Sequence, residues 1–544
     1  MDSELISARR EDVLQAYNSA KATNRRLFLE GDDKATSEYI FPNQMEDANS
    51  IVNLFYKENR RVISIQKKTK VGADGLMIEI AKLLTTHPDD DFVVNLENVR
   101  ILTGMSNAGW EKDMKEKAPT CFKEKIFHHG KLSRADLANI KNALIIIDEI
   151  DTGDKECQVL HNTLKEACVL DVNKMVENNN RFVFISATMI RELYALYTWG
   201  ELHQLYKMTI PDAYIGHKDF LDKGIVKEFY PLNSSENAER WVREDITENY
   251  KKDFRVHIVR VTARTVNIVQ NACIREGIMF RNHTSRDRLS EAEIREFFKE
   301  PLINHIVLGV KGFFRRANLI PNRWKLRIGA THEFFTKNVD NNVQIQGLTG
   351  RMTGYWRDEI QSGRITGPHR TSVRSIEEYE KTYLDPFGTN NYQTSGFKKT
   401  GGKVSDGGSS CIMLSAKHVK NLVPVALEPV PEEEVDPHLY RVYSDESMVR
   451  RVCEKLGYNY RETKIGADGF RETSLNYKKK IVSLEEAVKK VPTGYAIHNG
   501  EKKWRTCYPC YENVEDNKSL RFVVIIRPDT KMEDLEECDS WVLP

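Results

Sequence analysis

The feature that most constrains the fold is a series of short apolar runs separated by amphipathic stretches. Four of these runs, at 61–65, 99–103, 143–147 and 181–185, are rich in Ile, Val and Phe and end in a turn or a polar segment. Runs of this length that alternate with helical stretches are typical of buried parallel strands joined by crossover helices. The sequence therefore predicts an α/β domain in this part of the chain.

The same alternation begins again near residue 225. Strands are expected at 256–261, 303–308 and 327–329, with helices between them at 266–276 and 290–299. The two series show no visible sequence identity, so they indicate a repeat of architecture only. We expect two α/β domains in tandem, each with a parallel sheet and flanking helices.

A third folded unit is expected near the C-terminus. Helical stretches at 446–456 and 484–491 and an apolar run at 521–526 predict a small α+β domain. The chain of 544 residues then has five parts: a helical lead-in at 1–45, a first α/β domain at 46–215, a second at 225–383, a flexible linker at 384–437 and the α+β domain at 438–544. The linker is predicted because glycine-rich, serine-rich and acidic stretches lie within it.

Composition excludes several classes of protein. Lys and Arg total 81 and Asp and Glu total 80, so a globally basic nucleic-acid coat is excluded and any nucleic-acid site is a local patch. The first residues do not resemble a signal peptide, and no run of roughly 18 apolar residues predicts a membrane span. Nine dispersed cysteines do not indicate a disulfide framework. We expect an intracellular protein of the cytoplasm or nucleus that is not secreted and does not bind a membrane.

The sharpest chemical signal is an acidic cluster directly after the apolar run at 143–147. It contains Asp148, Glu149 and Asp151. Ligands of parallel α/β sheets bind at the carboxyl ends of the strands, where one carboxylate can hold Mg²⁺ and the next can orient a water that attacks a phosphate. The alternative is that the cluster is only the solvated end of a strand.

A second signal, Ser186-Ala187-Thr188, follows the apolar run at 181–185. Its two hydroxyl groups can hydrogen-bond the acidic cluster and pass the state of a bound nucleotide to a second domain. The alternative is an ordinary strand-to-helix turn with a Ser or Thr cap.

The order and spacing of these two elements resemble the D-E-x-D and S-A-T motifs of superfamily 2 helicases of the DEAD/DEAH-like kind. Three further elements lie in that family's order: 41–44, which ends in Gln44, then 309–316, and 346–351, which resembles the Q-x-x-G-R element. The resemblance covers roughly residues 40–360 and is strongest to helicase-like proteins of large DNA viruses. It implies two RecA-like domains around an ATP site and, for a viral protein, a location inside the host cell.

The resemblance also implies roles for single residues. Asp148 is expected to hold the Mg²⁺ that accompanies ATP, Glu149 to position the attacking water, and Arg351 to approach the γ-phosphate from the second domain. Gln44 is expected to contact adenine, and Gln346 to contact the nucleotide. Three residues are expected to couple hydrolysis to domain movement: Ser186, Ala187 and Thr188.

The phosphate-binding loop departs from the family pattern. That pattern ends in Gly-Lys-Thr or Gly-Lys-Ser, and neither triplet occurs in this chain. Alignment on Gly72 puts Ala73 at the position of the lysine and Asp74 at the position of the hydroxyl residue. The loss of one charge-assisted contact of this kind costs on the order of 1.5–3 kcal/mol in binding.

Two outcomes remain open for this loop. Either a lysine within it, Lys67, Lys68 or Lys70, folds back onto the phosphates, or the protein is a pseudo-enzyme that binds nucleotide weakly or not at all. In the first outcome nucleotide contacts are expected from four residues of this segment: Lys70, Gly72, Asp74 and Gly75.

A basic segment with interleaved aromatic residues is the candidate nucleic-acid site. Lys311, Arg315 and Arg316 lie beside Phe313 and Phe314. Basic side chains neutralise phosphates and aromatic faces stack on bases, so this segment is expected to contact the backbone of single- or double-stranded DNA or RNA. The alternative is that the aromatic residues are core and the arginines form a solvated face.

The leading hypothesis is ATP-dependent unwinding of, or translocation along, nucleic acid. The alternative is a catalytically inactive helicase-fold scaffold that binds nucleic acid or a viral or replication partner. The degenerate loop favours the scaffold, whereas the acidic cluster, the Ser-Ala-Thr element and Arg351 favour the enzyme. The domain at 438–544 is a candidate site for a protein partner.

Overall fold

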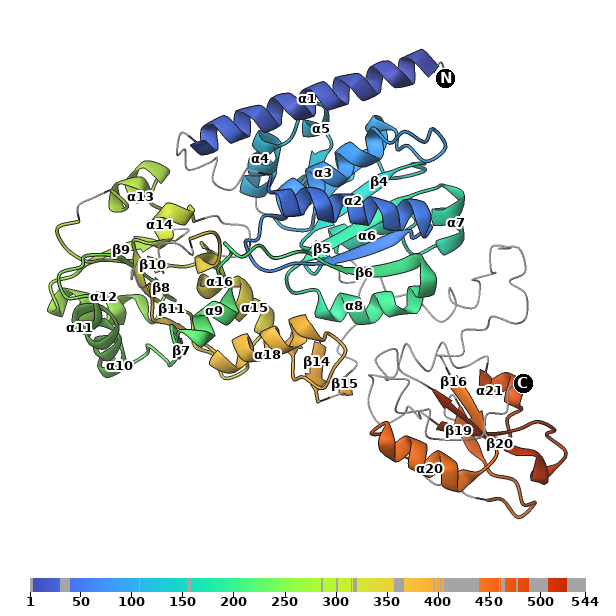
Figure 1. Cartoon of the computed structure of the whole chain (residues 1–544). Helices are drawn as coiled ribbons and strands as arrows, with labels where there is room; N and C mark the ends of the chain where they lie inside the picture. Colours follow the sequence, from blue (N-terminus) through green and yellow to red (C-terminus); the bar gives the residue numbers. More distant parts are fainter. Residues whose placement is uncertain are drawn as a thin grey trace. The chain divides into compact units, whose positions relative to one another are not determined.

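The computed structural model describes residues 3–29, 40–106, 108–153, 158–284, 287–299, 302–314, 316, 320–356, 366–395, 397–401, 403–405, 440–458, 460, 465–475, 478–488 and 507–525 (Figure 1). The chain divides into two compact units. The first unit extends to Gly401 and holds two α/β domains, and the second holds the C-terminal domain.

The first domain is built on a six-stranded parallel sheet with the strand order β3-β2-β4-β5-β1-β6. Asp148 at the end of one strand pairs with Ile185, and Gln66 at the end of another pairs with Ser186, so three strand ends meet at one edge of the sheet. The strands are β1 (Val62–Gln66), β2 (Val99–Thr103), β3 (Ile126–Phe127), β4 (Leu144–Asp148), β5 (Arg181–Ser186) and β6 (His203–Lys207).

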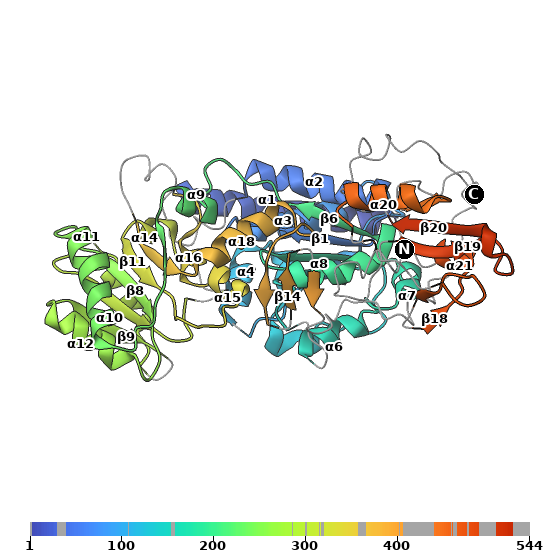
Figure 2. The same ribbon diagram turned by 90° about the horizontal axis from the view of Figure 1, so that it is seen from below.

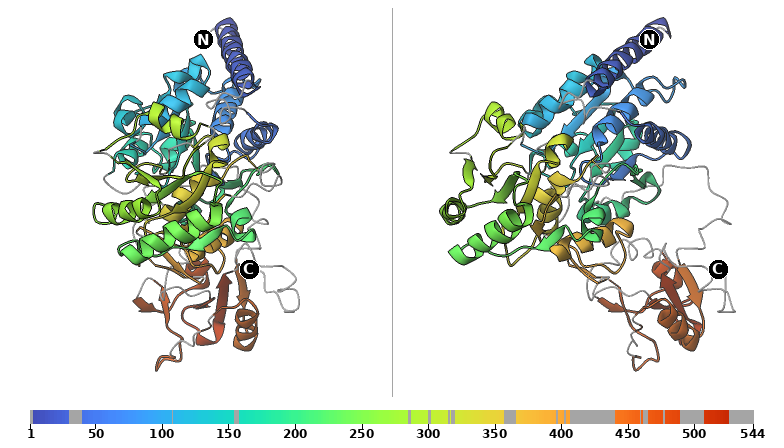
Figure 3. Two further views of the ribbon diagram at one scale, coloured as in Figure 1. Left: turned by 90° about the vertical axis from the view of Figure 1, so that its left-hand side faces the viewer. Right: turned by 60° about the vertical axis from the view of Figure 1, so that its left-hand side comes forward.

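Helices cover both faces of this sheet. Ile63, Ile146 and Ile185 pack in one core with α2 (Pro42–Lys57) and α3 (Ala73–Thr85). Figure 2 shows α6 on the opposite side of the sheet from α2, and α1 lies on the outside of the domain against α3 and α5 (Figure 3). The other helices are α1 (Ser3–Leu29), α4 (Ala108–Lys117), α5 (Thr120–Lys123), α6 (Val159–Glu166), α7 (Val172–Glu177) and α8 (Ile190–Leu196).

The second domain repeats this plan with the strand order β7-β12-β11-β8-β10-β9, again parallel. Its strands are β7 (Val226–Glu228), β8 (Val256–Arg260), β9 (Met279–His283), β10 (Ile306–Val310), β11 (Ile328–His332) and β12 (His369–Thr371). Its helices are α9 (His217–Asp222), α10 (Ser235–Arg240), the π-helical segment Trp241–Thr247, α11 (Glu248–Tyr250), α12 (Val266–Arg275), α13 (Glu291–Phe297), α14 (Asn322–Lys325), α15 (Asn341–Gln346), α16 (Leu348–Met352) and α18 (Val373–Leu384). In Figure 1, α15 and α16 lie between the two sheets.

Several strands of the two sheets carry no continuous apolar run and were not expected from the sequence. β6 is half-exposed along most of its length, and β9 buries only His283. Both are edge strands, which meet solvent and therefore do not show the pattern of a fully buried strand. β3, β7 and β12 have only two or three residues each.

Part of the segment predicted as a flexible linker at 384–437 is folded, and this corrects the prediction. β13 (Gln393–Thr394) pairs with β14 (Phe397–Thr400), and Tyr392 and Lys399 are buried. The Lys399 ammonium donates a hydrogen bond to the Pro386 carbonyl at 3.0 Å. The low apolar content of this segment conceals these contacts, because two of the buried groups are polar.

The C-terminal unit is a three-stranded antiparallel sheet between two helices. The strand order is β16-β20-β19, and α20 packs on one face and α21 on the other. Its elements are β15 (Lys403–Ser405), β16 (Tyr440–Tyr443), α20 (Glu446–Lys455), β17 (Thr473–Leu475), β18 (Lys478–Lys480), α21 (Leu484–Val488), β19 (Cys507–Tyr511) and β20 (Leu520–Ile525).

The expected fold class is confirmed: two tandem RecA-like domains with parallel sheets precede a small α+β domain. Among the described helices, none combines the length and apolar content needed to cross a lipid bilayer.

Candidate functional site between the two α/β domains

The loop between β1 and α3 has a form suited to an anion. Lys70 and Gly72 have φ values of 57° and 90°, and α3 begins directly afterwards at Ala73. Backbone conformations that alternate in this way form concavities of N–H groups, and a helix N-terminus adds its dipole. The loop has this form although Gly72 is followed by Ala73 and Asp74, and not by a lysine and a hydroxyl residue.

Gln44 braces this loop from α2. Its amide nitrogen donates to the Gly72 carbonyl, and its Oε1 accepts from the Phe41 N–H at 3.0 Å. A Cβ at position 75 would lie too close to Gln44 Oε1, so only a glycine at this position leaves room for the Gln44 side chain. Phe41 in turn stacks on Tyr355 of the second domain with ring centroids 4.7 Å apart. Gln44 therefore lies at the loop with both ends of its amide bonded within the chain, and its expected contact with adenine stays a prediction.

Lys67, the first residue after β1, points at the acidic cluster. Its ammonium lies 3.3 Å from Asp148 Oδ1 and 3.1 Å from Glu149 Oε1. The second oxygen of Asp148 accepts from the Trp110 indole N–H at 2.9 Å. Burial disfavours the charged ammonium, but the two carboxylates outweigh burial and raise the pKa of Lys67 above its usual value.

Asp74, at the start of α3, is also paired. Its carboxylate lies 2.7 Å from the ammonium of Lys117 on α4. Burial raises the pKa of Asp74, but Lys117 more than offsets this effect and holds it below the usual range. Asp74 therefore remains a carboxylate whose charge is already compensated.

The Ser-Ala-Thr element lies against the acidic cluster. Ser186 donates to Asp151 Oδ1 at 2.8 Å, and Thr188 donates to Asp151 Oδ2 at 2.8 Å. Ser186 is also 3.4 Å from Glu149 Oε2. Ala187 between them is buried. The structure thus brings together the two motifs that the sequence analysis connected, at the edge where β4 and β5 end.

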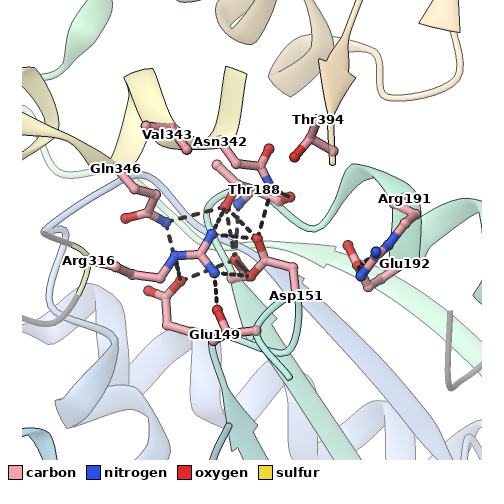
Figure 4. Close-up of polar contacts among 12 residues, drawn as sticks. Glu149, Asp151, Thr188, Arg191, Glu192, Arg316, Asn342, Val343, Gln346 and Thr394 are labelled. Atoms are coloured by element: carbon pink, nitrogen blue, oxygen red, sulfur yellow. Dashed lines mark hydrogen bonds and ion pairs between the residues drawn. The ribbon is translucent and has the colours of Figure 1, made fainter. Parts of the chain in front are cut away.

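Side chains of the second domain reach the same cluster (Figure 4). Arg316 forms ion pairs with Asp151 Oδ2 at 2.5 Å and Glu149 Oε2 at 3.3 Å. Gln346 donates to Glu149 Oε2 at 3.2 Å, and Asn342 donates to Asp151 Oδ2 at 3.1 Å. Burial opposes ionisation of Glu149, but Lys67 and Arg316 lower its pKa below the usual range. The acidic cluster therefore belongs to both domains.

Arg351 lies in the core of this interface. Its Nη1 donates to the Arg316 carbonyl at 2.9 Å and its Nη2 to Gln346 Oε1 at 3.1 Å. Burial lowers the pKa of Arg351 to about 10. Gln346 and Arg351, for which the resemblance implies contacts with the nucleotide, therefore both lie in the cleft.

The predicted nucleic-acid residues fall in three different situations. Lys311 is exposed at the end of β10, and Arg315 lies outside the described residues. Arg316 is turned into the cleft and bound to the acidic cluster, which corrects its assignment to a nucleic-acid surface. Adjacent residues in an irregular segment point in different directions, and the sequence does not show which one turns inward.

A cavity of about 970 Å³ lies next to these groups. Lys70, Lys325 and Arg351 line it together with Lys67 and residues of α4. Burial, then the positive charges of Arg351, Lys67 and Lys325, holds the pKa of Lys70 well below its usual value. Within the part of the chain that the structure describes, Lys70 makes no hydrogen bond or ion pair. A cavity with several cations in mutual repulsion favours the binding of an anion.

Two residues of this network were not singled out from the sequence. Asn342 binds Asp151, and the hydroxyl of Tyr392 donates to Asn342 Oδ1 at 2.7 Å. Tyr392 lies in the segment that was predicted as linker. An aromatic residue in an otherwise polar segment is the one sequence signal that could have pointed to Tyr392.

No known family model and no curated protein matches this chain. Among solved structures, the chain is similar to S. cerevisiae Dbp5 bound to RNA and ADP BeF3, with 13% identity over 65% of this chain and 93% of that one and a TM-score of 0.33. It is also similar to the DEAD-box helicase Mss116 bound to ssRNA and UDP-BeF, with 12% identity, coverage of 67% and 82% and a TM-score of 0.37. A third is a DEAD box protein from the hyperthermophile Methanococcus jannaschii, with 14% identity, coverage of 62% and 90% and a TM-score of 0.32.

Proposed function

We propose that the cleft between the two α/β domains binds a nucleoside triphosphate and that the protein is a superfamily 2 ATPase that unwinds nucleic acid or moves along it. One observation carries the proposal: Arg316, Gln346 and Asn342 of the second domain bind the acidic cluster of the first. A ligand that binds among these groups changes the contacts of both domains at once. Such differential contact is what couples binding to domain movement.

The phosphates would lie against the loop at 67–72 and the start of α3. Backbone N–H groups at a helix N-terminus favour an anion, and Lys70 and Arg351 lie on the same cavity. A bound phosphate would raise the pKa of Lys70, which would then supply the positive charge that Ala73 cannot. This is the first of the two outcomes that the sequence left open for the loop.

The Mg²⁺ predicted at Asp148 does not fit the groups around it. One oxygen of Asp148 accepts from Lys67 and the other from Trp110, while Asp74 is paired with Lys117. Mg²⁺ requires oxygen ligands in near-octahedral geometry, and here nitrogen donors lie on the carboxylates that would have to supply them. The proposed chemistry therefore uses the chain's own charges.

In the proposed hydrolysis, Glu149 orients the attacking water. Its lowered pKa keeps it ionised at neutral pH. Lys67 and Arg351 would stabilise the negative charge that develops on the transferred phosphoryl group, a task that fixed cations perform in a dry cleft. When the contacts of Asp151 change on hydrolysis, Ser186 and Thr188 would transmit that change to β5.

The test is ATP hydrolysis by the purified protein with and without single-stranded RNA or DNA. We expect stimulation by the strand and loss of hydrolysis in Glu149→Gln, with the exposed Glu248→Gln as the matched control. Hydrolysis that survives Glu149→Gln would contradict the proposal. An Ala73→Lys, Asp74→Thr double variant tests whether the family's own loop residues increase the rate.

A second candidate is a nucleotide-responsive scaffold without turnover. The observation that favours it is the pairing of Lys67 with both Asp148 and Glu149, because a carboxylate held by an ammonium is less available to orient water. Nucleotide binding by calorimetry without hydrolysis in any variant would support the scaffold. Under either candidate the protein would bind DNA or RNA through the sugar-phosphate backbone. Deletion of the domain at 438–544 would test whether that domain binds a protein partner.

A further inference from the structure

We infer that the ammonium of Lys67 is a built-in replacement for a divalent cation, so that the cleft binds the phosphates of a nucleotide without metal. The inference rests on the nucleotide site proposed above and assigns that site its ionic requirement.

The position of the ammonium is the first argument. Lys67 Nζ lies between Asp148 Oδ1 and Glu149 Oε1 at 3.3 and 3.1 Å, where it bridges neighbouring carboxylates of the acidic cluster. Both carboxylates are buried. Displacing the ammonium would break two buried ion pairs, which is strongly unfavourable unless an incoming charge replaces both.

The loop holds Lys67 firmly in this place. Its backbone N–H donates to the Ser186 carbonyl at 3.2 Å, which extends the pairing of β1 with β5 by one residue. The side chain then crosses the end of β5 to the end of β4, in accordance with the strand order β4-β5-β1. The ammonium is therefore positioned by the sheet and not by a mobile loop tip.

A second site for a metal ligand is closed in the same way. The family places a hydroxyl residue at position 74, and here Asp74 is held by Lys117 at 2.7 Å. The loop does have a hydroxyl residue at Thr69, but its hydroxyl lies 2.9 Å from the Thr353 hydroxyl of the second domain. The described residues contain no group of three or more His, Cys, Asp or Glu side chains arranged to hold a metal ion.

The charge around the cavity completes the argument. Lys67, Arg316 and Arg351 line it beside the acidic cluster, and it is also lined by Lys70 and Lys325, whose pKa values burial and neighbouring cations hold low. A divalent cation would add to the repulsion among these cations, whereas a phosphate chain relieves it and favours the protonated forms of Lys70 and Lys325. Fixed ammonium and guanidinium groups thus supply what a metal supplies in other phosphate sites.

The experiment measures binding and not turnover. Isothermal titration calorimetry with ATP and with inorganic tripolyphosphate is performed on the full chain in EDTA and in Mg²⁺, for wild type, Lys67→Met, Lys67→Arg and the exposed control Lys218→Met. Electron paramagnetic resonance of Mn²⁺ then reports directly whether a metal site exists in each variant, and circular dichroism confirms that each variant is folded.

We expect wild type and Lys218→Met to bind equally well in EDTA and in Mg²⁺ and to bind no Mn²⁺ tightly. Lys67→Arg should keep this behaviour. Lys67→Met should lose about ten- to hundredfold in affinity in EDTA, regain it in Mg²⁺ and acquire a Mn²⁺ site at the freed carboxylates.

Three outcomes overturn the inference, and they differ in what else they affect. Wild-type binding that occurs only with Mg²⁺ refutes metal independence and leaves the proposed nucleotide site standing. Absence of ATP and tripolyphosphate binding under both conditions refutes the nucleotide site, and the inference with it. A tight Mn²⁺ site in wild type also refutes the inference, even if Lys67→Met fails to fold.

Discussion

Replacing Arg316 by Met should release the two domains from each other. Arg316 binds Asp151 through Nη1 at 2.9 Å and Nη2 at 2.5 Å, and it donates to Thr188 Oγ1 at 2.6 Å. Among the described residues, Asp151 would keep only neutral hydrogen-bond donors, from Ser186, Thr188 and Asn342. Leaving a buried charge without its partner costs about 3–5 kcal/mol.

The cost should appear as domain opening and not as unfolding, because Arg316 contributes to neither core. Hydrogen–deuterium exchange of peptides covering 147–153 and 184–190 measures that opening. A change of about 3–5 kcal/mol accelerates exchange by roughly two to three and a half orders of magnitude. Amides of the C-terminal unit provide an internal reference.

Two further variants show whether the charge is responsible. Lys311→Met removes an exposed cation from the same domain and should leave exchange unchanged. Arg316→Met combined with Asp151→Asn should recover part of the protection, because the uncompensated charge is gone. Acceleration of less than about threefold in Arg316→Met, which is the scale of an exposed ion pair, would refute the assignment of Arg316 as a buried link between the domains.

Three further outcomes are expected. Burial and Arg351 lower the pKa of Lys325 to about 7. Because the unfolded state then binds this proton more tightly, the free energy of unfolding should rise between about pH 7 and 10. The affinity for pyrophosphate should instead rise as the pH falls through about 7, and Lys325→Met should flatten both pH profiles, the first measured by denaturation and the second by calorimetry. Because both ends of the Gln44 amide are bonded within the chain, competition binding should show less than about threefold preference for ATP over GTP, below the value of one net hydrogen bond; a larger preference would show that Gln44 reads the base. Gly72→Ala should lower stability by about 1–2 kcal/mol in urea unfolding, since φ is 90° and the new Cβ would lie 2.9 Å from Gln44 Nε2; an unchanged midpoint would contradict this strain.

The sequence determined the strands that form the centre of each sheet. β2, β4, β5, β8 and β10 are each buried along nearly their whole length, so the local apolar run and the tertiary environment agree. The acidic cluster and the Ser-Ala-Thr element follow two of these strands directly, and a parallel sheet places strand ends together. The meeting of Asp151 with Ser186 and Thr188 was therefore predictable from local pattern and strand direction alone.

Only the tertiary structure decided which basic residue faces which acid. Lys67, Lys68 and Lys70 were all candidates in the sequence, with Lys70 named as the expected nucleotide contact, but they have three separate environments. Lys67 binds the acidic cluster, Lys68 binds Glu380 at 2.6 Å, and Lys70 lines the cavity. The partners are far away in sequence, and the direction of each side chain depends on loop dihedrals that composition does not specify.

The same reason explains why Arg316 and Tyr392 were misplaced. Their contacts with Asp151 and Asn342 span 165 and 50 residues, and both lie in segments without helical or strand periodicity. Periodicity reports which face of a regular element is buried, and it reports nothing about an irregular segment that folds into a cleft. The composition of the cleft, with cations of both domains around one acidic cluster, is thus a property of the assembled pair of domains, because it arises where the ends of two sheets meet.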